Sequence, residues 1–371
     1  MKKTLPEVVY QLKNSVYINM GRIFIPWIIK HIRSLPSVIR LVIGYRKSAK
    51  VRKKELLNGI MVPPFLIISI TSRCNLRCAG CYAAATGTVC KNSTKKSLNL
   101  NQWQEIINDA KQLGVFGFLI AGGEPFILSD LLRLCEDNED RLFIILTNGT
   151  LLKERDFKRL QKLKNAVIMV SVEGNRFLTD QRRGRGVHEK ALNTIQKLNK
   201  LGVLNGVSVT ITRNNFRYWM NEKNIDYLIA KGIKLGFFIE YIPVENGTNL
   251  MLSNEESKEF RKRILYYRQK KSILIIHSPG DEEYAGGCVS AGRGFAHITP
   301  GGDLTPCPVS NIATHNLKKS SLREGLKSPL FKIIRENEHL LETNGSPCAL
   351  FAHPEEVTQL AKLVNAYKTG N

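Results

Sequence analysis

Three cysteines near residue 80 have a spacing that suits iron–sulfur chemistry. Cys74, Cys78 and Cys81 are separated by three and then by two residues. Cysteine thiolates hold iron–sulfur clusters, so three of them on one tight loop can bind three irons of a cubane cluster. The missing fourth ligand leaves one iron open, as in catalytic metal sites that keep a free position. The alternative is a closed zinc site, for which Cys90 would be the nearest fourth ligand.

A second set of cysteines lies in the last part of the chain. Cys288 and Cys307 form the pattern C-x13-G-x4-C, and Cys348 follows further on. Three thiols allow at most one more cluster, with either an open iron or a non-cysteine ligand such as His353 or Asp303. The alternative is that these cysteines are unrelated members of a small core. Eight cysteines in 371 residues are too few for a disulfide scaffold, which favours metal binding.

The elements that must position these cysteines alternate along the middle of the chain. Apolar runs rich in β-formers predict strands at 64–71, 115–121, 142–147, 166–172, 207–212 and 235–242. Stretches with helical patterning lie at 101–113, 128–138, 153–163, 187–201, 218–231 and 253–270. Such alternation predicts parallel strands with right-handed crossovers. Six units are too few for a closed eight-stranded barrel, so we expect an α/β fold, a partial (β/α)6 TIM-type barrel. Its chemistry should lie in the loops after the strand C-termini.

The pattern changes after residue 275 to short runs of glycine, proline and cysteine. A hairpin turn is expected at 299–303 and a final helix at 354–367. The predicted organisation is therefore a basic N-terminal segment over 1–61, the partial barrel over 62–275, and a small cysteine-containing domain over 276–371.

Charge is unevenly distributed along the chain. Lysine and arginine number 55 against 32 acidic residues, a net charge of +23, and residues 1–54 hold 13 of the cations and a single acid. A globular composition with 43% hydrophobic residues excludes a disordered chain. The excess charge favours an anionic partner, such as nucleic acid, a phospholipid surface or a phosphorylated substrate.

The segment 16–45 is very apolar but too often interrupted by charge to span a membrane. Polar or helix-breaking residues recur every three or four positions, at Asn19, Arg22, Pro26, Lys30, Arg33, Ser37 and Arg40. This spacing predicts a basic amphipathic helix, kinked near Pro26 and Pro36, that lies in a membrane interface. The alternative is a helix that covers the body of the protein or a partner subunit.

The order of motifs resembles the radical S-adenosylmethionine (radical SAM) superfamily over residues 63–243. The cysteine loop follows the first predicted strand, as in that family. Similar motifs follow at later strand ends: Gly122-Gly123-Glu124-Pro125, Leu146-Thr147-Asn148-Gly149, Ser171-Val172-Glu173-Gly174, Arg182-Arg183-Gly184-Arg185-Gly186 and Val209-Thr210-Ile211-Thr212. Each string alone is short, and their order at successive strand ends makes the match specific.

The resemblance implies roles for several of these residues. Glu124 and the backbone of Gly122, Gly123 and Pro125 would bind the methionine amino group, and glycine permits the close approach. Asn148 closes the third strand and Thr210 lies at another edge of the cofactor site, as in similar family members.

The remaining roles concern the far end of the cofactor. Ser171 and Glu173 would contact the ribose or methionine end, and Arg183 would meet the methionine carboxylate. One departure affects the adenine. Many members have an aromatic residue just before the third cysteine, where this chain has Gly80, so Tyr82 becomes the candidate for stacking.

The resemblance also implies the cofactors and the chemistry. Cys74, Cys78 and Cys81 would hold an oxygen-sensitive [4Fe-4S] cluster with one open iron, reduced by a flavodoxin or ferredoxin under anaerobic conditions. The reduced cluster cleaves S-adenosylmethionine to methionine and a 5′-deoxyadenosyl radical, which abstracts hydrogen from an unactivated carbon. The C-terminal cysteines resemble the SPASM/twitch branch. There the three thiols Cys288, Cys307 and Cys348 would hold one auxiliary cluster.

Three hypotheses for function follow. The first is a radical enzyme acting on a membrane lipid or isoprenoid chain, peripheral on the inner, cytoplasmic face of the membrane and held by anionic headgroups. The second is a peptide- or protein-modifying maturase of the SPASM type. The third is a nucleic-acid-binding iron–sulfur protein. The chain lacks an aromatic-plus-basic binding motif, so no specific nucleic acid is expected.

Overall fold

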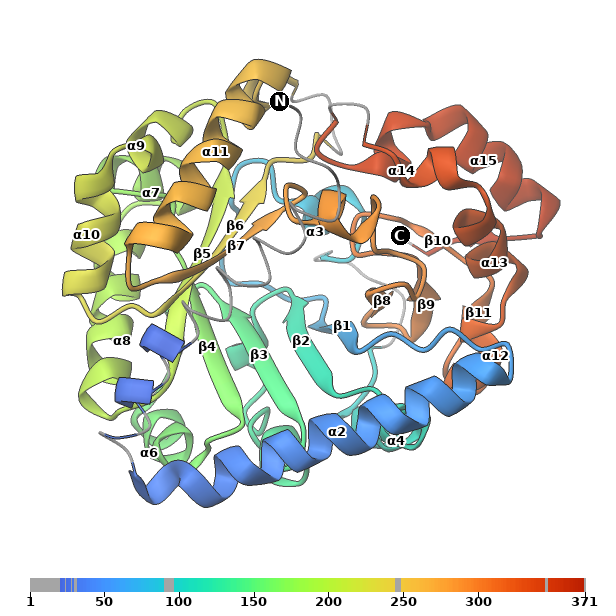
Figure 1. Cartoon of the computed structure of the whole chain (residues 1–371), viewed down its shortest axis with the longest axis horizontal. Coiled ribbons are helices and arrows are strands. Elements are labelled where there is room, and N and C mark those ends of the chain that lie inside the picture. Colours follow the sequence, from blue (N-terminus) through green and yellow to red (C-terminus); the bar gives the residue numbers. More distant parts are fainter. Residues whose placement is uncertain are drawn as a thin grey trace.

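The computed structural model of this chain describes residues 21–369, apart from residues 24, 28, 30, 31, 90–96, 244–247, 344 and 345. Residues 1–20 and Cys90, on which parts of the predictions rest, lie outside the described residues. The described strands form a ten-stranded sheet in the order β11-β9-β8-β1-β2-β3-β4-β5-β6-β7, with a separate two-stranded sheet of β10 and β12 (Figure 1).

Seven neighbouring strands of this sheet are parallel and curve into a partial barrel. They are β1 Phe65–Thr71, β2 Gly117–Gly122, β3 Leu142–Thr147, β4 Ala166–Ser171, β5 Asn205–Ile211, β6 Leu235–Glu240 and β7 Leu274–Ser278. Every residue of β4 is buried, as expected of a central strand covered on both faces. The predicted α/β partial barrel is confirmed, and β7 adds a strand to the six expected. Its five residues are too short a run to stand out, and pairing along β6 stabilises them as a strand.

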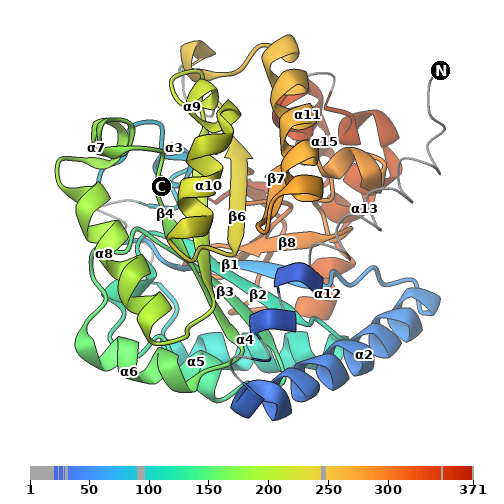
Figure 2. The same ribbon diagram turned by 60° about the vertical axis from the view of Figure 1, so that its left-hand side comes forward.

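The barrel helices cover the outer side of the sheet, as Figures 1 and 2 show. They are α4 Leu100–Leu113, α6 Glu154–Lys162, α7 Arg176–Arg183, α8 Val187–Lys200, α9 Phe216–Met220, α10 Glu222–Ala230 and α11 Asn254–Lys270. Capping boxes begin α4, between Asn99 and Gln102, and α11, between Ser253 and Glu256.

Two predicted helices differ from the structure. The stretch 128–138 forms only the short helix α5, Arg133–Glu136, preceded by the 3-10 turn η2, Pro125–Ile127. The stretch 218–231 is divided between α9 and α10 at Asn221. This residue has an extended backbone, and its side chain accepts a hydrogen bond from the backbone N–H of Lys223, so it ends one helix and caps the next.

The C-terminal region continues the barrel sheet. Strand β8, Phe295–Ile298, pairs parallel with β1, and β9, Asp303–Thr305, returns antiparallel to β8. The predicted hairpin turn joins them, with the Thr299 N–H donating to the Asp303 carbonyl at 2.9 Å. The predicted domain boundary at 275 falls inside β7, so the sheet does not end where the composition changes.

Short elements complete this region. They are the 3-10 turns η4 Glu282–Ala285 and η5 Glu338–Leu341, the strands β10 Ile312–Ala313, β11 His315–Asn316 and β12 Tyr367–Lys368, and the helices α12 Leu322–Leu326, α13 Pro329–Glu336, α14 Ala349–Ala352 and α15 Pro354–Leu363. The final helix is shorter than expected because residue 367 pairs with β10.

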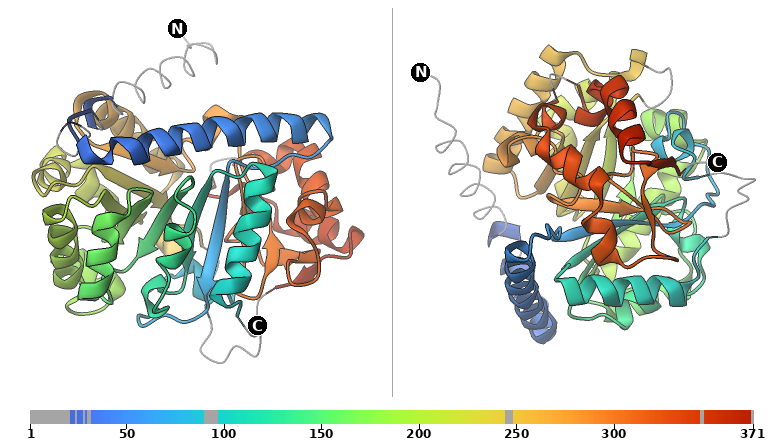
Figure 3. Two further views of the ribbon diagram at one scale, coloured as in Figure 1. Left: turned by 90° about the horizontal axis from the view of Figure 1, so that it is seen from below. Right: turned by 90° about the vertical axis from the view of Figure 1, so that its right-hand side faces the viewer.

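A long helix, α2 (Leu35–Leu57), runs across one end of the barrel (Figure 3). Pro36 lies in its first turn, so the predicted break is the start of a helix. Arg52 donates to the Gly114 carbonyl at 2.6 Å, and the ring of Tyr45 packs edge-on against Phe116 at 5.3 Å. Both partners precede β2, so α2 lies at the N-terminal ends of the strands. The described part of the N-terminal segment therefore covers the body, as the alternative prediction held.

No helix among the described residues is long and apolar enough to cross a membrane.

Candidate active site

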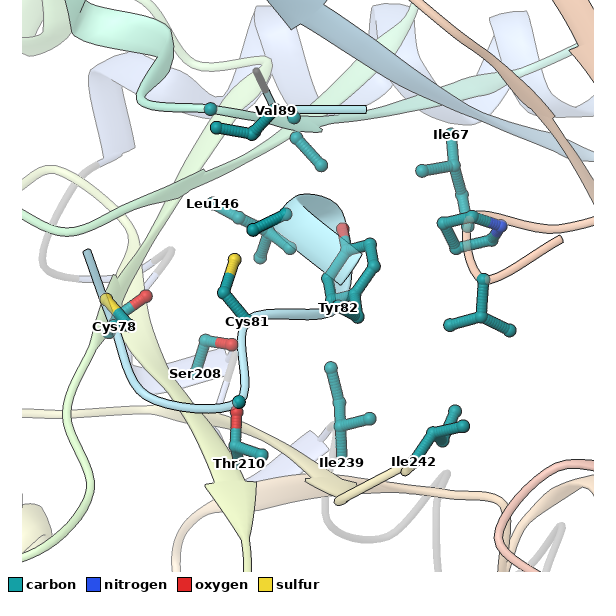
Figure 4. Close-up of a pocket in the computed structure, with 18 of the residues that line it drawn as sticks. Ile67, Cys78, Cys81, Tyr82, Val89, Leu146, Ser208, Thr210, Ile239 and Ile242 are labelled. Carbon is teal, nitrogen blue, oxygen red and sulfur yellow. The ribbon is translucent and has the colours of Figure 1, made fainter. Parts of the chain in front are cut away.

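One cavity of about 890 Å³ lies at the C-terminal ends of the parallel strands and is lined by both sets of cysteines. Most predicted site residues line it: Cys74, Cys78, Cys81, Tyr82, Gly122, Gly123, Glu124, Asn148, Ser171, Arg183, Thr210, Cys288, Cys307 and Cys348. Of the other two, Pro125 begins η2 beside the cavity, and Glu173 lies just behind the lining. Figure 4 shows Cys78, Cys81 and Tyr82 on one loop, with Ser208 and Thr210 on β5, Ile239 on β6 and Ile242 just after β6.

The cysteine loop begins directly after β1 and is held on two sides. The backbone N–H of Glu124 donates to the carbonyl of Arg73 at 2.9 Å, which fastens the loop to the end of β2. On the other side, the N–H of Ala79 donates to the carbonyl of Arg182 at 2.9 Å. The three thiols are half-buried along this loop. The loop is therefore fixed in place by the motifs that follow β2 and β4.

Glu124 is a buried acceptor at the end of β2. Its Oε1 accepts from the Thr147 hydroxyl at 2.6 Å and from the Phe126 N–H at 3.1 Å, and its Oε2 accepts from the Asn148 N–H at 2.7 Å. Burial raises the pKa of this carboxyl, and the hydrogen bonds oppose that rise. Because Oε2 has a single donor, it has room for one more from a ligand in the cavity.

Asn148 links the third strand to the cysteine loop. Its side-chain Nδ2 donates to Asn75 Oδ1 at 2.8 Å, and its Oδ1 accepts from the hydroxyl of Thr150 at 2.7 Å. Asn148, which was predicted to lie at the cofactor site, thus also holds the cysteine loop in place. Asn75 is adjacent to Cys74, so this hydrogen bond positions the first of the three thiols.

Glu173 forms ion pairs with two arginines behind the cavity. Its Oε1 accepts from Arg182 and Arg183, each at 2.7 Å, and its Oε2 accepts from the Thr210 N–H at 3.1 Å. The Arg183 guanidinium reaches Cys78 Sγ at 4.0 Å. Burial raises the pKa of the Cys78 thiol, and the two guanidinium charges oppose the rise. These cations would stabilise a thiolate at the second cysteine.

Tyr82 lines the cavity together with both sets of cysteines. It follows Cys81 and begins the short helix α3, Tyr82–Ala85. Burial raises the pKa of its hydroxyl, and neighbouring Cys81 and Cys307 add to the rise. Tyr82 therefore lies near a thiol of each set, and Tyr82, Cys81 and Cys307 all line the cavity. This position adds a second possible use for a residue that was predicted to stack on adenine.

The three C-terminal cysteines line the same cavity, with Cys288 and Cys307 buried and Cys348 half-buried. Burial raises the pKa of Cys288 to about 12 and that of Cys348 to about 11, and it raises the pKa of Cys307 as well. The charge of Cys348 adds to the rise at Cys288, and the charges of Cys348 and Cys288 add to the rise at Cys307. A thiol must lose its proton to bind iron. Thiolates without a metal would be unfavourable in this buried position, and binding to the irons of a cluster would stabilise them.

Backbone N–H groups oppose the rise in the pKa of each thiol. They are that of Ser290 at Cys288, those of Val309 and Ser310 at Cys307, and those of Leu350 and Phe351 at Cys348. Such N–H···S contacts stabilise ligating thiolates and tune cluster potentials. The residues present therefore fit an iron–sulfur cluster. No three His, Cys, Asp or Glu side chains in the described ranges lie close enough to hold a single metal ion.

The non-cysteine ligands predicted for the second set are placed elsewhere. Asp303 Oδ1 accepts from Asn316 and from the Tyr367 hydroxyl, each at 2.8 Å. The ring of His353 packs against that of His339, with centroids 5.9 Å apart. Neither Asp303 nor His353 lines the cavity.

Sequence reasoning missed two residues of the site. Arg182 binds Glu173 and lines the cavity, but nothing in the sequence separates it from Arg183. Glu282 also lines the cavity, where burial raises the pKa of its carboxyl and the Ser278 hydroxyl donates to its Oε1 at 2.9 Å. It stands in a run of three acidic residues that has the appearance of a solvated loop. Glu282 could be recognised as a site residue only from the structure, which places it in the wall of the cavity.

Comparisons with known proteins agree with this geometry. The model of the "Radical SAM superfamily" matches residues 68–215. Fe-coproporphyrin III synthase of Methanosarcina barkeri is 31% identical over 157 residues, which cover 42% of this chain and 38% of that protein. AdoMet-dependent heme synthase of the same organism is 25% identical, over 75% of this chain and 86% of that protein. PqqA peptide cyclase of Rhizobium meliloti is 25% identical, over 72% and 74% respectively.

A solved structure shares the fold. SuiB of Streptococcus suis bound to S-adenosylmethionine superposes with a TM-score of 0.64 and 20% identity, over 78% of this chain and 72% of that one. The same protein has been solved with precursor peptide SuiA (TM-score 0.63, 21% identity, 78% and 70% covered). Motif order and the family match agree, and residues 68–215 of this chain belong to the radical SAM superfamily.

Proposed function

We propose that this radical SAM enzyme modifies a peptide, using a [4Fe-4S] cluster on Cys74, Cys78 and Cys81 and one auxiliary cluster on Cys288, Cys307 and Cys348. The observation that carries the proposal is the shared cavity, whose wall contains both sets of thiols. A substrate in that cavity would contact both cofactor sites at once.

The cofactors supply the reactivity, because a reduced cluster and S-adenosylmethionine together yield a 5′-deoxyadenosyl radical. The protein orients the reactants and excludes water. Glu124, which follows the end of β2, accepts a hydrogen bond from a ligand amine. Arg183 offers positive charge beside Cys78. These groups come from different strands, so the fold fixes their relative positions before a substrate arrives.

The rest of the cavity wall is largely apolar. Ile67, Val89, Leu146, Ile239 and Ile242 face it, as Figure 4 shows. Its volume is within the range of ordinary ligand sites, about 300–1,000 Å³. An apolar wall shields a carbon radical from water and suits apolar side chains of a peptide.

The relatives favour a peptide over a lipid. PqqA peptide cyclase is named for a peptide substrate, and the fold neighbour SuiB has been solved with a precursor peptide. Haem-related names among the relatives make a tetrapyrrole the competing substrate class. A lipid receives less support, because α2 lies at the N-terminal ends of the strands and the cavity at their C-terminal ends. A bilayer against α2 would therefore face away from the cavity.

The substrate class is tested by mass spectrometry of cells with and without the gene. Extracts are separated into peptides, lipids and tetrapyrroles, and each fraction is compared for mass shifts. A gene-dependent change confined to peptides supports the proposal. A change confined to tetrapyrroles or to lipids contradicts it and identifies the class that replaces it.

A second proposal concerns where the enzyme works: α2 binds the cytoplasmic face of a membrane. The side of α2 turned away from the body is apolar in its first half. Exposed residues there and just before it are Ile32, Leu35, Ile39, Val42 and Ile43. Its second half is cationic, with Arg46, Lys47, Lys50, Lys53 and Lys54 exposed. Anionic lipid attracts each such cation by about 1 kcal/mol, and the apolar residues add to this. Attachment on this side leaves the cavity open to a soluble peptide.

A further inference from the structure

We infer that Glu240 binds a positively charged group of the substrate, the amino group of a lysine or the guanidinium group of an arginine. The inference deepens the proposed function, since it rests on a peptide entering the cavity. It gives a specificity-determining role to the carboxylate at the end of β6.

Glu240 lies in the cavity wall beside one of the predicted cofactor residues. It is the last residue of β6, and in the parallel pairing of β5 with β6 it is opposite Ile211, which follows Thr210. Its side chain is 5% exposed and lines the cavity. The residues predicted to contact S-adenosylmethionine follow β1 to β5, so Glu240 is one strand beyond them. A substrate that fills the cavity next to the cofactor would therefore meet this carboxylate.

Two side chains hold the carboxylate from behind the wall. The hydroxyl of Ser257, on α11, lies 2.7 Å from Oε1 and 2.8 Å from Oε2. Nε2 of His277, on β7, lies 2.9 Å from Oε1. The His277 ring is buried and packs edge-on against Phe260, with centroids 5.3 Å apart. Neither Ser257 nor His277 lines the cavity, so the position of the carboxylate is set before a ligand enters.

The other ring nitrogen of His277 shows how this pair shares its protons. Nδ1 is buried and has no hydrogen-bond partner. A Cβ added at Gly280 would clash with it, so the backbone of this glycine packs over the nitrogen. A single ring proton is therefore best placed on Nε2, where Glu240 accepts it, whereas a second proton on Nδ1 would have no acceptor. His277 thus orients the carboxylate without balancing its negative charge.

The cations of the cavity wall are placed elsewhere. Four arginines line the cavity: Arg73, Arg77, Arg182 and Arg183. The first two belong to the cysteine loop, and the last two pair with Glu173, each at 2.7 Å. Within the described part of the chain, no lysine or arginine forms an ion pair with Glu240. A buried carboxylate without a cationic partner is unfavourable, and a cation supplied by the ligand would compensate it.

Oε2 of Glu240 has room for such a partner. Among the described residues it accepts only from the Ser257 hydroxyl, whose single proton it shares with Oε1. A carboxylate oxygen can accept two hydrogen bonds, so at least one position remains for a donor in the cavity. A charged donor forms the stronger hydrogen bond and also balances the charge, which favours an ammonium or guanidinium group over a neutral amide. An anionic group would be repelled at this point.

The test selects peptides by binding and needs no turnover. A random peptide display library is applied to the full-length chain, reconstituted anaerobically, loaded with S-adenosylmethionine and kept oxidised so that the cofactor stays intact. The wild type is compared with Glu240→Gln, Glu240→Asp and the matched control Glu336→Gln, an exposed carboxylate on α13. Circular dichroism verifies folding. The net charge of +23 attracts acidic peptides non-specifically, so retention of basic peptides indicates a specific site.

We expect lysine and arginine to be enriched in the peptides that the wild type and Glu336→Gln retain. Glu240→Gln should lose this enrichment. Glu240→Asp should keep a weaker one, because the charge remains on a shorter side chain. A selected lysine peptide should bind the wild type about ten-fold more tightly than its norleucine analogue, which has an uncharged side chain of similar length. Glu240→Gln should bind the two peptides about equally.

Two results would overturn the inference, and they differ in meaning. If the wild type and Glu240→Gln retain peptides with the same content of lysine and arginine, Glu240 does not bind a cation, and the proposed function stands. If the folded wild type retains no peptides, the peptide substrate of the proposed function fails, and the role of Glu240 fails with it.

Discussion

The ring of Tyr241, at the end of β6, lies directly against Gly80 in the cysteine loop. Gly80 has φ +63°, and a Cβ added there would stand 2.7 Å from Cε2 of the tyrosine ring and 3.2 Å from its hydroxyl oxygen. Many family members have an aromatic side chain at the position before the third cysteine. This chain has a glycine there, and the ring of Tyr241 lies in the space that a side chain at residue 80 would need. Gly80 and Tyr241 form a matched pair.

We predict that Gly80→Ala disturbs the loop. The added methyl group meets the Tyr241 ring, and overpacking of this kind costs about 1–3 kcal/mol, with about 1 kcal/mol more for positive φ. Thermal unfolding and S-adenosylmethionine affinity of the reconstituted protein should both fall. The double variant Gly80→Ala/Tyr241→Ala should recover part of the loss, because the clash is relieved. Equal losses in the single and double variants would show that the ring contact has no influence.

A second prediction concerns the first cluster. Replacing Cys74, Cys78 and Cys81 with alanine should abolish cleavage of S-adenosylmethionine to 5′-deoxyadenosine. About half the iron should remain, on the stoichiometry of two cubane clusters. The control is Cys135→Ala, which removes a fully buried core thiol and should keep all the iron. Cofactor cleavage by the anaerobically reconstituted triple variant would contradict the site.

A third prediction concerns the buried carboxylate behind the cavity. Glu173→Gln leaves Arg182 and Arg183 with an uncharged partner, and breaking a buried pair costs about 3–5 kcal/mol. The unfolding midpoint should fall, and S-adenosylmethionine should bind more weakly because Thr210 and Arg183 lose a common anchor. Glu259→Gln, which removes an exposed pair with Arg217, should cost at most about 1 kcal/mol. Similar losses in the two variants would contradict a special role for Glu173.

A fourth prediction concerns pH and His297, which is buried between β1 and β9. Its Nδ1 donates to the Thr305 hydroxyl oxygen at 2.8 Å, because that hydroxyl itself donates to the Cys307 carbonyl. Its Nε2 therefore accepts from Ser69 at 2.7 Å. Burial lowers the pKa of His297 to about 3. Between about pH 3 and pH 6.5, His297 therefore binds a proton in the unfolded chain but not in the folded chain.

The sign follows from this difference. Below about pH 6.5 the unfolded state gains protons, so the stability that His297 contributes is complete above that pH and is lost as the pH falls towards 3. The slope is at most about 1.4 kcal/mol per pH unit. Denaturant unfolding at several pH values should show a steeper loss for the wild type than for His297→Gln. Parallel curves would remove His297 as the cause.

A fifth prediction tests the membrane surface. The full chain should sediment with vesicles containing anionic lipid, and high salt alone should release it poorly because the apolar residues stay inserted. Ile39→Gln/Ile43→Gln should make binding salt-sensitive, and Lys47→Gln/Lys50→Gln should weaken it at low salt. Leu363→Gln, an exposed apolar residue on α15, is the matched control. Absence of binding by the wild type would leave α2 as a packing helix.

The strand–helix alternation and the order of the motifs could be predicted without a structure. Cysteine spacing and strand-end strings are local, so their positions can be read without a structure. Parallel strands then bring their C-terminal ends to one edge, which is why Glu124, Asn148 and Thr210 could be expected together.

The contacts between segments that are distant in the sequence could not be predicted in this way. The pairing of β8 with β1 brings Cys307 close to Tyr82, and no local pattern encodes that pairing. The same holds for Glu282 and Cys348, which are far apart in the sequence and line the same cavity. It also holds for α2, whose buried side is formed by small and polar residues while its apolar residues stay exposed. Amphipathic spacing predicts that a helix has two faces, but which face packs depends on the shape of the surface it meets.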